Sequence, residues 1–381
     1  MNPGRGLVSL GAGLGAAVAG AVLGLAAERA AVGKPLLPRP GGPTGLVPFG
    51  SVRSAPLVVQ SDDGTALHVE VDEPDEPDPD GLTVVFSHGY ALNLDSWHFQ
   101  RLALRGRYRM VFWDQRGHGR SQRGPVGSAT IDQVGADLAA VIASTAAEGP
   151  LVLVGHSMGG MTVMSLAARD PELFDERVAG VALVATSAGG IAKNDYGLKF
   201  VGPAFQRLAP TALAFLARAP ALVERGRRLG GDLEQLLVRR YSYGSPVSDE
   251  LVDFTARMIA ATRIEVINDF FPEFTRHDKR QALASLSGIE TLVLVGDDDL
   301  LTPDSHSDEI VLRIPQAEEV IVPDAGHLVM LEHPGLVTSH IVELLDRARR
   351  SIEGEPGAAR RRRGRRGRGS RTTSVRPRAA S

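Results

Sequence analysis

The sequence predicts an α/β protein built on a doubly wound, mostly parallel sheet with a helical cap. Short runs rich in Val, Leu and Ile recur along the chain and are too apolar to be surface strands. Helical patterns separate these runs, an alternation that is typical of such sheets. Over 187–287 the strand pattern disappears, which indicates a helical insertion. With 381 residues, 43% hydrophobic and 23% charged, the chain is long and apolar enough to form a folded core.

The predicted strands fall into two groups. Near 57–60 and 67–71 apolar and polar residues alternate ahead of an acidic turn, so we expect an antiparallel hairpin at one edge of the sheet. Buried parallel strands are expected at 83–87, 109–114, 151–155, 178–185, 291–296 and 320–323. Because ligands bind at the carboxyl ends of such strands, the loops that follow them are where a site is expected.

The predicted helices occupy the intervals between strands. One begins at Thr130, which has Gln133 three residues later, the spacing of a capping box, and apolar residues recur on one face after it. Helical stretches at 233–240 and 251–267 fill the insertion, and the periodicity of 336–352 indicates a last helix packed on the core. We therefore expect the folded domain to span 54–352, with the cap at about 187–287.

The N-terminal residues differ in composition from this domain. The 21 positions 7–27 carry no charge, and as a helix they would span about 31 Å, close to the hydrocarbon thickness of a bilayer. We expect 1–33 to be a hydrophobic membrane anchor or a cleaved export signal, with a soluble Ala/Gly-rich leader as a third possibility. Residues 34–53 are rich in Pro and Gly and predict an extended linker.

The C-terminal residues 353–381 contain ten arginines and no acidic residue after Glu355. Without interleaved aromatic residues or a recognition motif, this pattern indicates a disordered, solvated tail, and we do not expect it to bind nucleic acid. The excess of Arg over Lys, with abundant Ala and Gly, favours a high-GC bacterial source. The expected location is the bacterial cell envelope, either associated with the membrane through the N-terminal segment or exported.

The residues point to serine chemistry. The chain has no cysteine, which excludes disulfides, thiolate zinc sites, iron–sulfur clusters and a cysteine nucleophile. Residues 155–159 read Gly-His-Ser-Met-Gly, directly after an apolar strand and before a helical run. A serine on such a strand-to-helix turn projects its hydroxyl above the sheet, where the amides of the following helix stabilise negative charge. Ser157 is therefore the predicted nucleophile.

A serine nucleophile needs a base and a carboxylate, expected in the order Ser, Asp or Glu, His. His327 follows the strand that ends near 323 and is the predicted base. Three consecutive aspartates, Asp297, Asp298 and Asp299, follow the strand 291–296, and their position alone leaves the choice among them open.

These motifs resemble the α/β-hydrolase fold superfamily, in particular the group of bacterial serine esterases, lipases, cofactor-free haloperoxidase-like perhydrolases and epoxide hydrolases. The resemblance covers about 56–352 and includes 88–90 (His-Gly-Tyr), 114–121 (Asp-Gln-Arg-Gly-His-Gly-Arg-Ser) and 296–299 (Gly-Asp-Asp-Asp) with Thr302. It implies an eight-stranded sheet, Asp299 as the acid of the triad, and the backbone N–H groups of Tyr90 and Met158 as the oxyanion hole. It also implies a scaffold role for 114–121. Ser157 stands where epoxide hydrolases carry Asp, which disfavours that reaction.

The predicted function is hydrolysis of a carboxylic ester, from a lipid or a small molecule, through an acyl-enzyme and without metal or organic cofactor. Two alternatives stay open: perhydrolysis, in which peroxide replaces water, and ligand binding with little turnover. Trp97 follows the predicted oxyanion loop, where it either lines the acyl pocket or packs against a helix.

Overall fold

The computed structural model describes residues 47–191 and 231–354 of the chain. The predictions for 1–33, for the first part of the linker, for 192–230 of the insertion and for the tail from 355 lie outside these residues. All described residues other than 246–249 belong to one compact unit. No helix within the described ranges is long and apolar enough to cross a membrane.

The sheet has eight strands, in the spatial order β1-β2-β4-β3-β5-β6-β7-β8. Their bounds are β1 (Pro56–Gln60), β2 (Ala66–Asp72), β3 (Thr83–Ser87), β4 (Arg109–Trp113), β5 (Leu151–His156), β6 (Val178–Val184), β7 (Glu290–Gly296) and β8 (Glu318–Val322). Strand β2 pairs antiparallel with both β1 and β4, and all other pairs are parallel. The predicted fold class and the edge hairpin are confirmed.

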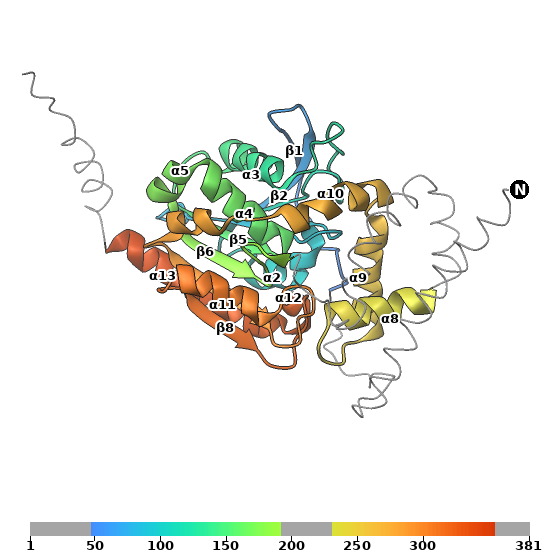
Figure 1. Ribbon diagram of the computed structural model, residues 1–381. Coiled ribbons are helices and arrows are strands. Elements are labelled where there is room, and N and C mark those ends of the chain that lie inside the picture. Colours follow the sequence, from blue (N-terminus) through green and yellow to red (C-terminus); the bar gives the residue numbers. More distant parts are fainter. Residues whose placement is uncertain (1–46, 192–230, 355–381) are drawn as a thin grey trace, which may run out of the picture. The chain divides into compact units, whose positions relative to one another are not determined.

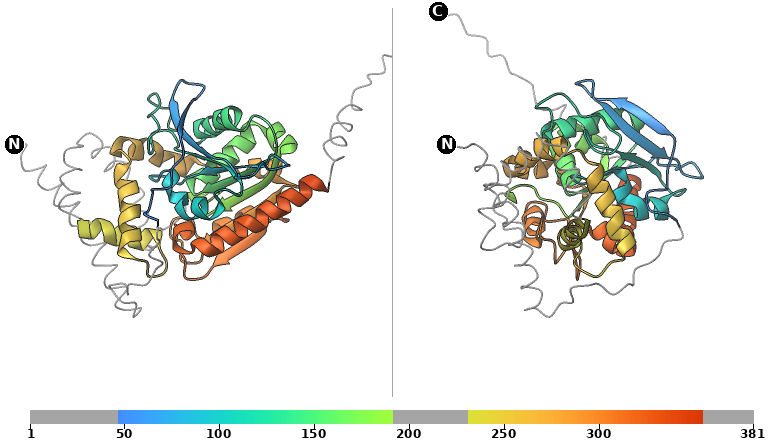
Figure 2. Two further views of the ribbon diagram at one scale, coloured as in Figure 1. Left: turned by 180° about the vertical axis from the view of Figure 1, so that it is seen from behind. Right: turned by 90° about the vertical axis from the view of Figure 1, so that its right-hand side faces the viewer.

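Helices cover both faces of the sheet (Figures 1 and 2). Their bounds are η1 (Leu94–Trp97), α2 (His98–Leu104), α3 (Ile131–Thr145), α4 (Met158–Arg169), α5 (Pro171–Glu176), α8 (Gly231–Ser242), α9 (Asp249–Ala261), α10 (Ile264–Arg276), η3 (Arg280–Leu286), α11 (Asp304–Arg313), α12 (Val329–Glu332) and α13 (Pro334–Glu353). Helices α2, α12 and α13 contact one another on one face, while α3, α4, α5, η3 and α11 share the core of the other.

Helix α3 begins as its sequence predicts, but only half of the capping box forms. The Thr130 hydroxyl accepts a hydrogen bond from the N–H of Gln133 at 3.1 Å, as an N-cap residue does. The Gln133 side chain does not return to the N–H of Thr130; it donates to Asp62 at 2.6 Å. The N–H of Thr130 instead donates to the carbonyl of Ser128 at 2.9 Å, so it has a partner without the Gln133 side-chain oxygen.

The two ends of the helical insertion are tied together at its base. Gly189 forms an isolated antiparallel bridge with Asp278, and the N–H of Lys279 donates to the carbonyl of Ala188 at 2.7 Å. The described part of the insertion holds α8, α9, α10 and η3. The single helix expected over 251–267 is two helices, because Arg263 adopts an extended backbone conformation (φ −65°, ψ 141°) between α9 and α10.

The folded body extends N-terminal of Ser54, where the sequence placed its start. The Phe49 ring stacks on Phe254 of α9 with centroids 5.0 Å apart, and lies 5.4 Å from the ring of His98. Val52 is buried, and Arg53 forms an ion pair with Asp95. Residues 49–53, assigned to the linker by composition, therefore join the cap helix α9 to the start of α2.

A buried ion-pair network lies beside this segment. The Arg101 guanidinium contacts Glu70 at 2.7 Å and Asp72 at 2.6 Å, and all three side chains are almost fully buried. Burial alone would raise the pKa of Glu70, but hydrogen bonds from His68, the Ser54 N–H and Arg101 outweigh it and lower that pKa to about 2. Glu70 is therefore held as a carboxylate.

Candidate active site

Ser157 lies between β5 and α4, at the carboxyl end of a central strand. Its backbone has φ 51° and ψ −116°, a left-handed value of φ that residues other than glycine rarely adopt. A Cβ on Gly159 would overlap the carbonyl of Ser87, and one on Gly155 would overlap the backbone of Gly159. Only glycine fits at both positions, so the motif lets the chain turn this tightly and leaves Ser157 partly exposed.

Two backbone N–H groups lie close to Ser157. Met158 is the first residue of α4, so its N–H has no partner within the helix. Tyr90 follows Gly89, on which an added Cβ would lie 3.3 Å from the Cβ of Ser157. Neither N–H has an acceptor among residues 47–191 and 231–354. Both are therefore available to an anion, and the positive end of the α4 dipole adds to their effect.

The Tyr90 side chain, unlike its backbone N–H, contacts the cap helix α10. Its hydroxyl donates to the carbonyl of Ile267 in α10, and its ring packs edge-on against Phe274 of the same helix, with centroids 4.8 Å apart. Burial raises the pKa of the Tyr90 phenol far above its ordinary value, so it stays protonated and able to donate. Cap helix α10 is thereby attached to the loop that carries one of the two N–H groups.

His327 contacts Asp299, one of the three consecutive aspartates. The His327 Nδ1 lies 2.8 Å from Asp299 Oδ2, and both side chains are buried. Asp299 Oδ1 accepts the N–H groups of Leu301 and Thr302 at 2.8 and 2.9 Å, and the Thr302 hydroxyl donates to Oδ2 at 2.9 Å. These bonds fix the carboxylate in orientation. Asp297 and Asp298 are exposed.

His156 links the His327 loop to the Ser157 turn, a role that the sequence reasoning missed. Its Nε2 lies 2.9 Å from the backbone carbonyl of His327, and the two imidazole rings are 4.9 Å apart. Burial holds the pKa of His156 well below its ordinary value, and the neighbouring His327 lowers it further. A neutral His156 with its proton on Nε2 donates to that carbonyl, so the residue before Ser157 locates His327.

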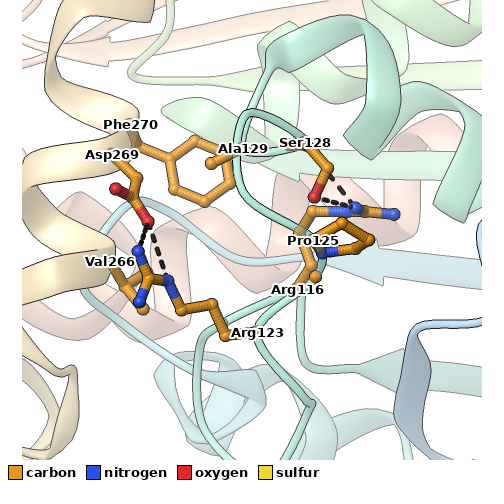
Figure 3. A pocket seen from close by; sticks show the side chains of 10 residues that line it. Arg116, Arg123, Pro125, Ser128, Ala129, Val266, Asp269 and Phe270 are labelled. Atoms are coloured by element: carbon orange, nitrogen blue, oxygen red, sulfur yellow. Dashed lines mark hydrogen bonds and ion pairs between the residues drawn. The ribbon is translucent and has the colours of Figure 1, made fainter.

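The loop 114–121 forms a scaffold, as the resemblance implies. The Arg116 guanidinium is buried and pairs with Asp137 at 2.6 Å and Asp63 at 2.7 Å. Figure 3 shows a cavity beside it, with Arg123 paired to Asp269 of α10 at its edge. This cavity has a volume of only about 10 Å³, the space of one water molecule, and none of the predicted site residues lines it. It is not a substrate pocket.

Trp97 packs in the core and is fully buried, so the structure favours packing over the pocket-lining role. Its ring lies 5.3 Å from Phe86 and 6.4 Å from His156, beneath the serine turn. The next residue, His98, is also buried, with its ring against those of Phe49 and Phe254. Neighbours far away in the sequence cover both side chains.

Among the described residues, one group has metal-ligand character: Glu318, His340 and Glu343, whose ligand atoms lie within 4.8 Å of one another. Arg347 Nη1 lies 2.7 Å from Glu318 Oε2, so a guanidinium already neutralises part of this charge. The group is on β8 and α13, whereas Ser157 and His327 lie in the loops after β5 and β8.

The geometry agrees with a family comparison. The family model described as alpha/beta hydrolase fold matches residues 83–334, about two thirds of the chain. The chain is an α/β hydrolase. Solved structures similar to this hydrolase include a thermophilic esterase from Thermogutta terrifontis, at 27% identity and a TM-score of 0.59, covering 77% of this chain and 99% of that one.

Its curated relatives differ in activity. The dihydrolipoyllysine-residue acetyltransferase component of the acetoin cleaving system of Pseudomonas putida is 29% identical over 270 residues, 70% of this chain and 64% of that protein. The hydrolase thus matches less than two thirds of that relative's length. A non-heme chloroperoxidase from Streptomyces lividans is 40% identical over 118 residues, 30% of this chain and 41% of that protein. Enol-lactonases are also among the relatives.

Proposed function

We propose that this α/β hydrolase cleaves a carboxylic ester, of a lipid or a small molecule, through an acyl-enzyme on Ser157. The observation that supports this best is the strained turn carrying Ser157 beside the buried His327–Asp299 pair, at the same edge of the sheet. Esterases and lactonases among the relatives and solved structures support the same reaction class.

In the proposed reaction the Ser157 Oγ attacks the ester carbonyl carbon while His327 accepts the hydroxyl proton. Asp299 accepts from His327 Nδ1, which keeps Nε2 unprotonated and ready to act as the base. The N–H groups of Tyr90 and Met158 bind the oxyanion, and each such donor typically contributes about 3 kcal/mol to lowering the barrier. His327 then protonates the departing alcohol, and a water molecule deprotonated by His327 releases the carboxylic acid and restores Ser157.

The test is activity profiling with p-nitrophenyl esters of graded acyl length, together with labelling by a fluorophosphonate probe. We expect hydrolysis with a preference for one chain length, and labelling of Ser157 that the substrate slows. A protein that binds these esters but neither hydrolyses them nor reacts with the probe would instead be a ligand-binding member of the family, the third possibility.

Perhydrolysis is the second candidate function, and the identity to a non-heme chloroperoxidase favours it. Hydrogen peroxide would attack the acyl-enzyme in place of water, releasing a peracid and regenerating the Ser157 hydroxyl. The test is bromination of phenol red in acetate buffer with bromide and peroxide, because a peracid oxidises bromide. Bromination that requires both acetate and Ser157 would support this reaction, whereas ester hydrolysis without bromination would exclude it.

We also propose that the N-terminal segment associates the hydrolase with a membrane or directs its export. Membrane fractionation and mass spectrometry of the mature N-terminus separate these cases. A new N-terminus just after Ala27 indicates a cleaved signal, an intact Met1 in the membrane fraction indicates an anchor, and an intact Met1 in the soluble fraction rejects both.

A further inference from the structure

Glu332, the last residue of α12, binds backbone groups of two separate segments. Its Oε2 accepts the N–H of Gly326 at 2.7 Å. Its Oε1 accepts the N–H of Gly244 at 2.9 Å and the hydroxyl of Ser245 at 2.6 Å, as well as the Ser245 N–H. One carboxylate therefore joins the residue before His327 to the connection that follows cap helix α8.

Residues 242–244, after α8, and 325–328, around His327, are in close backbone contact. The N–H of Leu328 donates to the carbonyl of Ser242 at 2.8 Å. A Cβ on Gly326 would stand 2.6 Å from the carbonyl carbon of Tyr243, and one on Gly244 would stand 2.7 Å from that of Ala325. Any side chain at either glycine would push the segments apart, so their sequences are matched to this contact.

The Glu332 carboxylate binds only groups at the contact between the connection after α8 and the His327 loop, among the described residues. Within the ranges 47–191 and 231–354 the carboxylate forms no ion pair, and its recorded partners are the three N–H groups and one hydroxyl described above. Hydrogen bonds to an ionised acceptor are shorter and stronger than neutral ones, and several on one carboxylate fix its orientation. The hydrogen bonds of the Glu332 carboxylate thus go to the connection after α8 and to the residue before His327.

We propose that Glu332 is a positioning residue that holds the His327 loop and the connection after α8 as one unit. The imidazole of His327 is then correctly placed toward Ser157 only while the cap connection is docked on Glu332. This inference rests on the proposed function, because it gives Glu332 a part in the same reaction. It couples the helical cap to the proposed catalytic base.

The experiment uses the full chain with Glu332→Gln, which preserves shape. An amide has one oxygen and one NH₂ group, so in either orientation its donor faces a backbone N–H on one of the two segments. We expect kcat, per active site titrated with the fluorophosphonate probe, to fall by about 10- to 100-fold, since a shift of about 1 Å in a reacting group can have such an effect. The rate of probe labelling falls in parallel, while KM changes by less than about twofold.

The matched control is Glu319→Gln, an exposed carboxylate on β8, which should leave kcat, KM and labelling unchanged. A merely structural role for Glu332 would lower the thermal midpoint and the number of titrated sites but leave kcat per titrated site at the wild-type value. That result would overturn the proposal. A wild-type protein that hydrolyses no ester and takes up no probe would instead refute the proposed function, before any variant is compared.

A second variant, Ser245→Ala, tests the coupling from the cap side. It removes one hydroxyl donor from Glu332 Oε1 and leaves the His327 loop untouched. We expect labelling of Ser157 to slow by about two- to fivefold, and the double variant to be no slower than Glu332→Gln alone, since coupled residues are not additive. Additive effects in the double variant would contradict the proposal. A Ser245→Ala variant with the wild-type labelling rate would contradict it even if Glu332→Gln does not fold.

Discussion

Replacing Asp299 with Asn should abolish most activity while preserving the fold. In the structure Asp299 Oδ1 accepts two backbone N–H groups, from Leu301 and Thr302, and Oδ2 faces His327 Nδ1 at 2.8 Å. An asparagine oxygen can keep both backbone bonds, which directs its NH₂ group at His327. Nδ1 must then accept, so the proton of the neutral imidazole moves to Nε2, and the base can no longer take the proton of Ser157.

The expected magnitude follows from this change of tautomer. The same substitution in a serine triad of another fold lowers kcat by about 10⁴, which corresponds to about 5 kcal/mol in the barrier. Stability should change far less, by about 1–2 kcal/mol, since the two hydrogen bonds at Oδ2, to His327 and to the Thr302 hydroxyl, are replaced while the backbone bonds remain. The assay is p-nitrophenyl acetate hydrolysis with the thermal midpoint measured on the same samples.

Asp297→Asn and Asp298→Asn serve as matched controls, because both side chains are exposed neighbours of Asp299. Each should retain kcat within about threefold of the wild type, as surface changes usually do. A kcat for Asp299→Asn within tenfold of the wild type, or an Asp298→Asn variant that is the most impaired of the three, would refute this assignment of the acid.

Three further predictions concern the nucleophile, stability in acid and the packing of Phe49 on the cap. Ser157→Ala should eliminate hydrolysis and probe labelling with an unchanged thermal midpoint; residual turnover above about 1% would reject Ser157. Because the pKa of Glu70 is about 2 in the folded state and ordinarily 4.5, the unfolded chain binds more protons between these values, and the free energy of unfolding falls as pH drops from 4.5 toward 2. In urea titrations at pH 7, 4 and 3, the free energy of unfolding of Glu70→Gln should fall less with decreasing pH than that of the wild type. Equal declines in the two proteins would disprove the argument. Phe49→Ala should lower the free energy of unfolding by about 1–2 kcal/mol, less than a fully buried Phe, because the ring is half-buried; an unchanged value would show that its stacking on Phe254 contributes nothing.

The sequence predicts the central strands well because parallel strands covered on both faces are mostly apolar. The expectation of a buried strand at 320–323 is wrong: β8 lies at the edge of the sheet and only its last residue, Val322, is buried. Strand β3 is buried at all five positions and β5 at all six, and residues 84–86 and 151–154 within them form uninterrupted apolar runs. The serine turn is equally visible, since its tight geometry requires glycine at fixed positions around Ser157. The choice of Asp299 among three consecutive aspartates, by contrast, depends on the path of one loop. The sequence pattern does not show that path, so the choice required the family resemblance.

The sequence does not reveal contacts whose partners are backbone groups or distant side chains. His156 and Glu332 bind a carbonyl and N–H groups, which every residue offers, so no pattern marks their partners. Proline-rich composition correctly excludes helix and strand over the described residues 47–53. Whether Phe49 packs, however, depends on a surface formed 200 residues later by α9. The predictions for 1–33, 192–230 and the tail stay predictions.

The bridge at the base of the insertion bears on how such proteins diversify. Because Gly189 pairs with Asp278, the chain leaves the sheet and returns to it at adjacent points, and β6 and β7 pair directly beneath. Segments with adjacent ends are those at which insertion and exchange are best tolerated. A cap from a relative could therefore be transplanted between these two residues, provided that it offers Glu332 the N–H groups that Gly244 and Ser245 supply here.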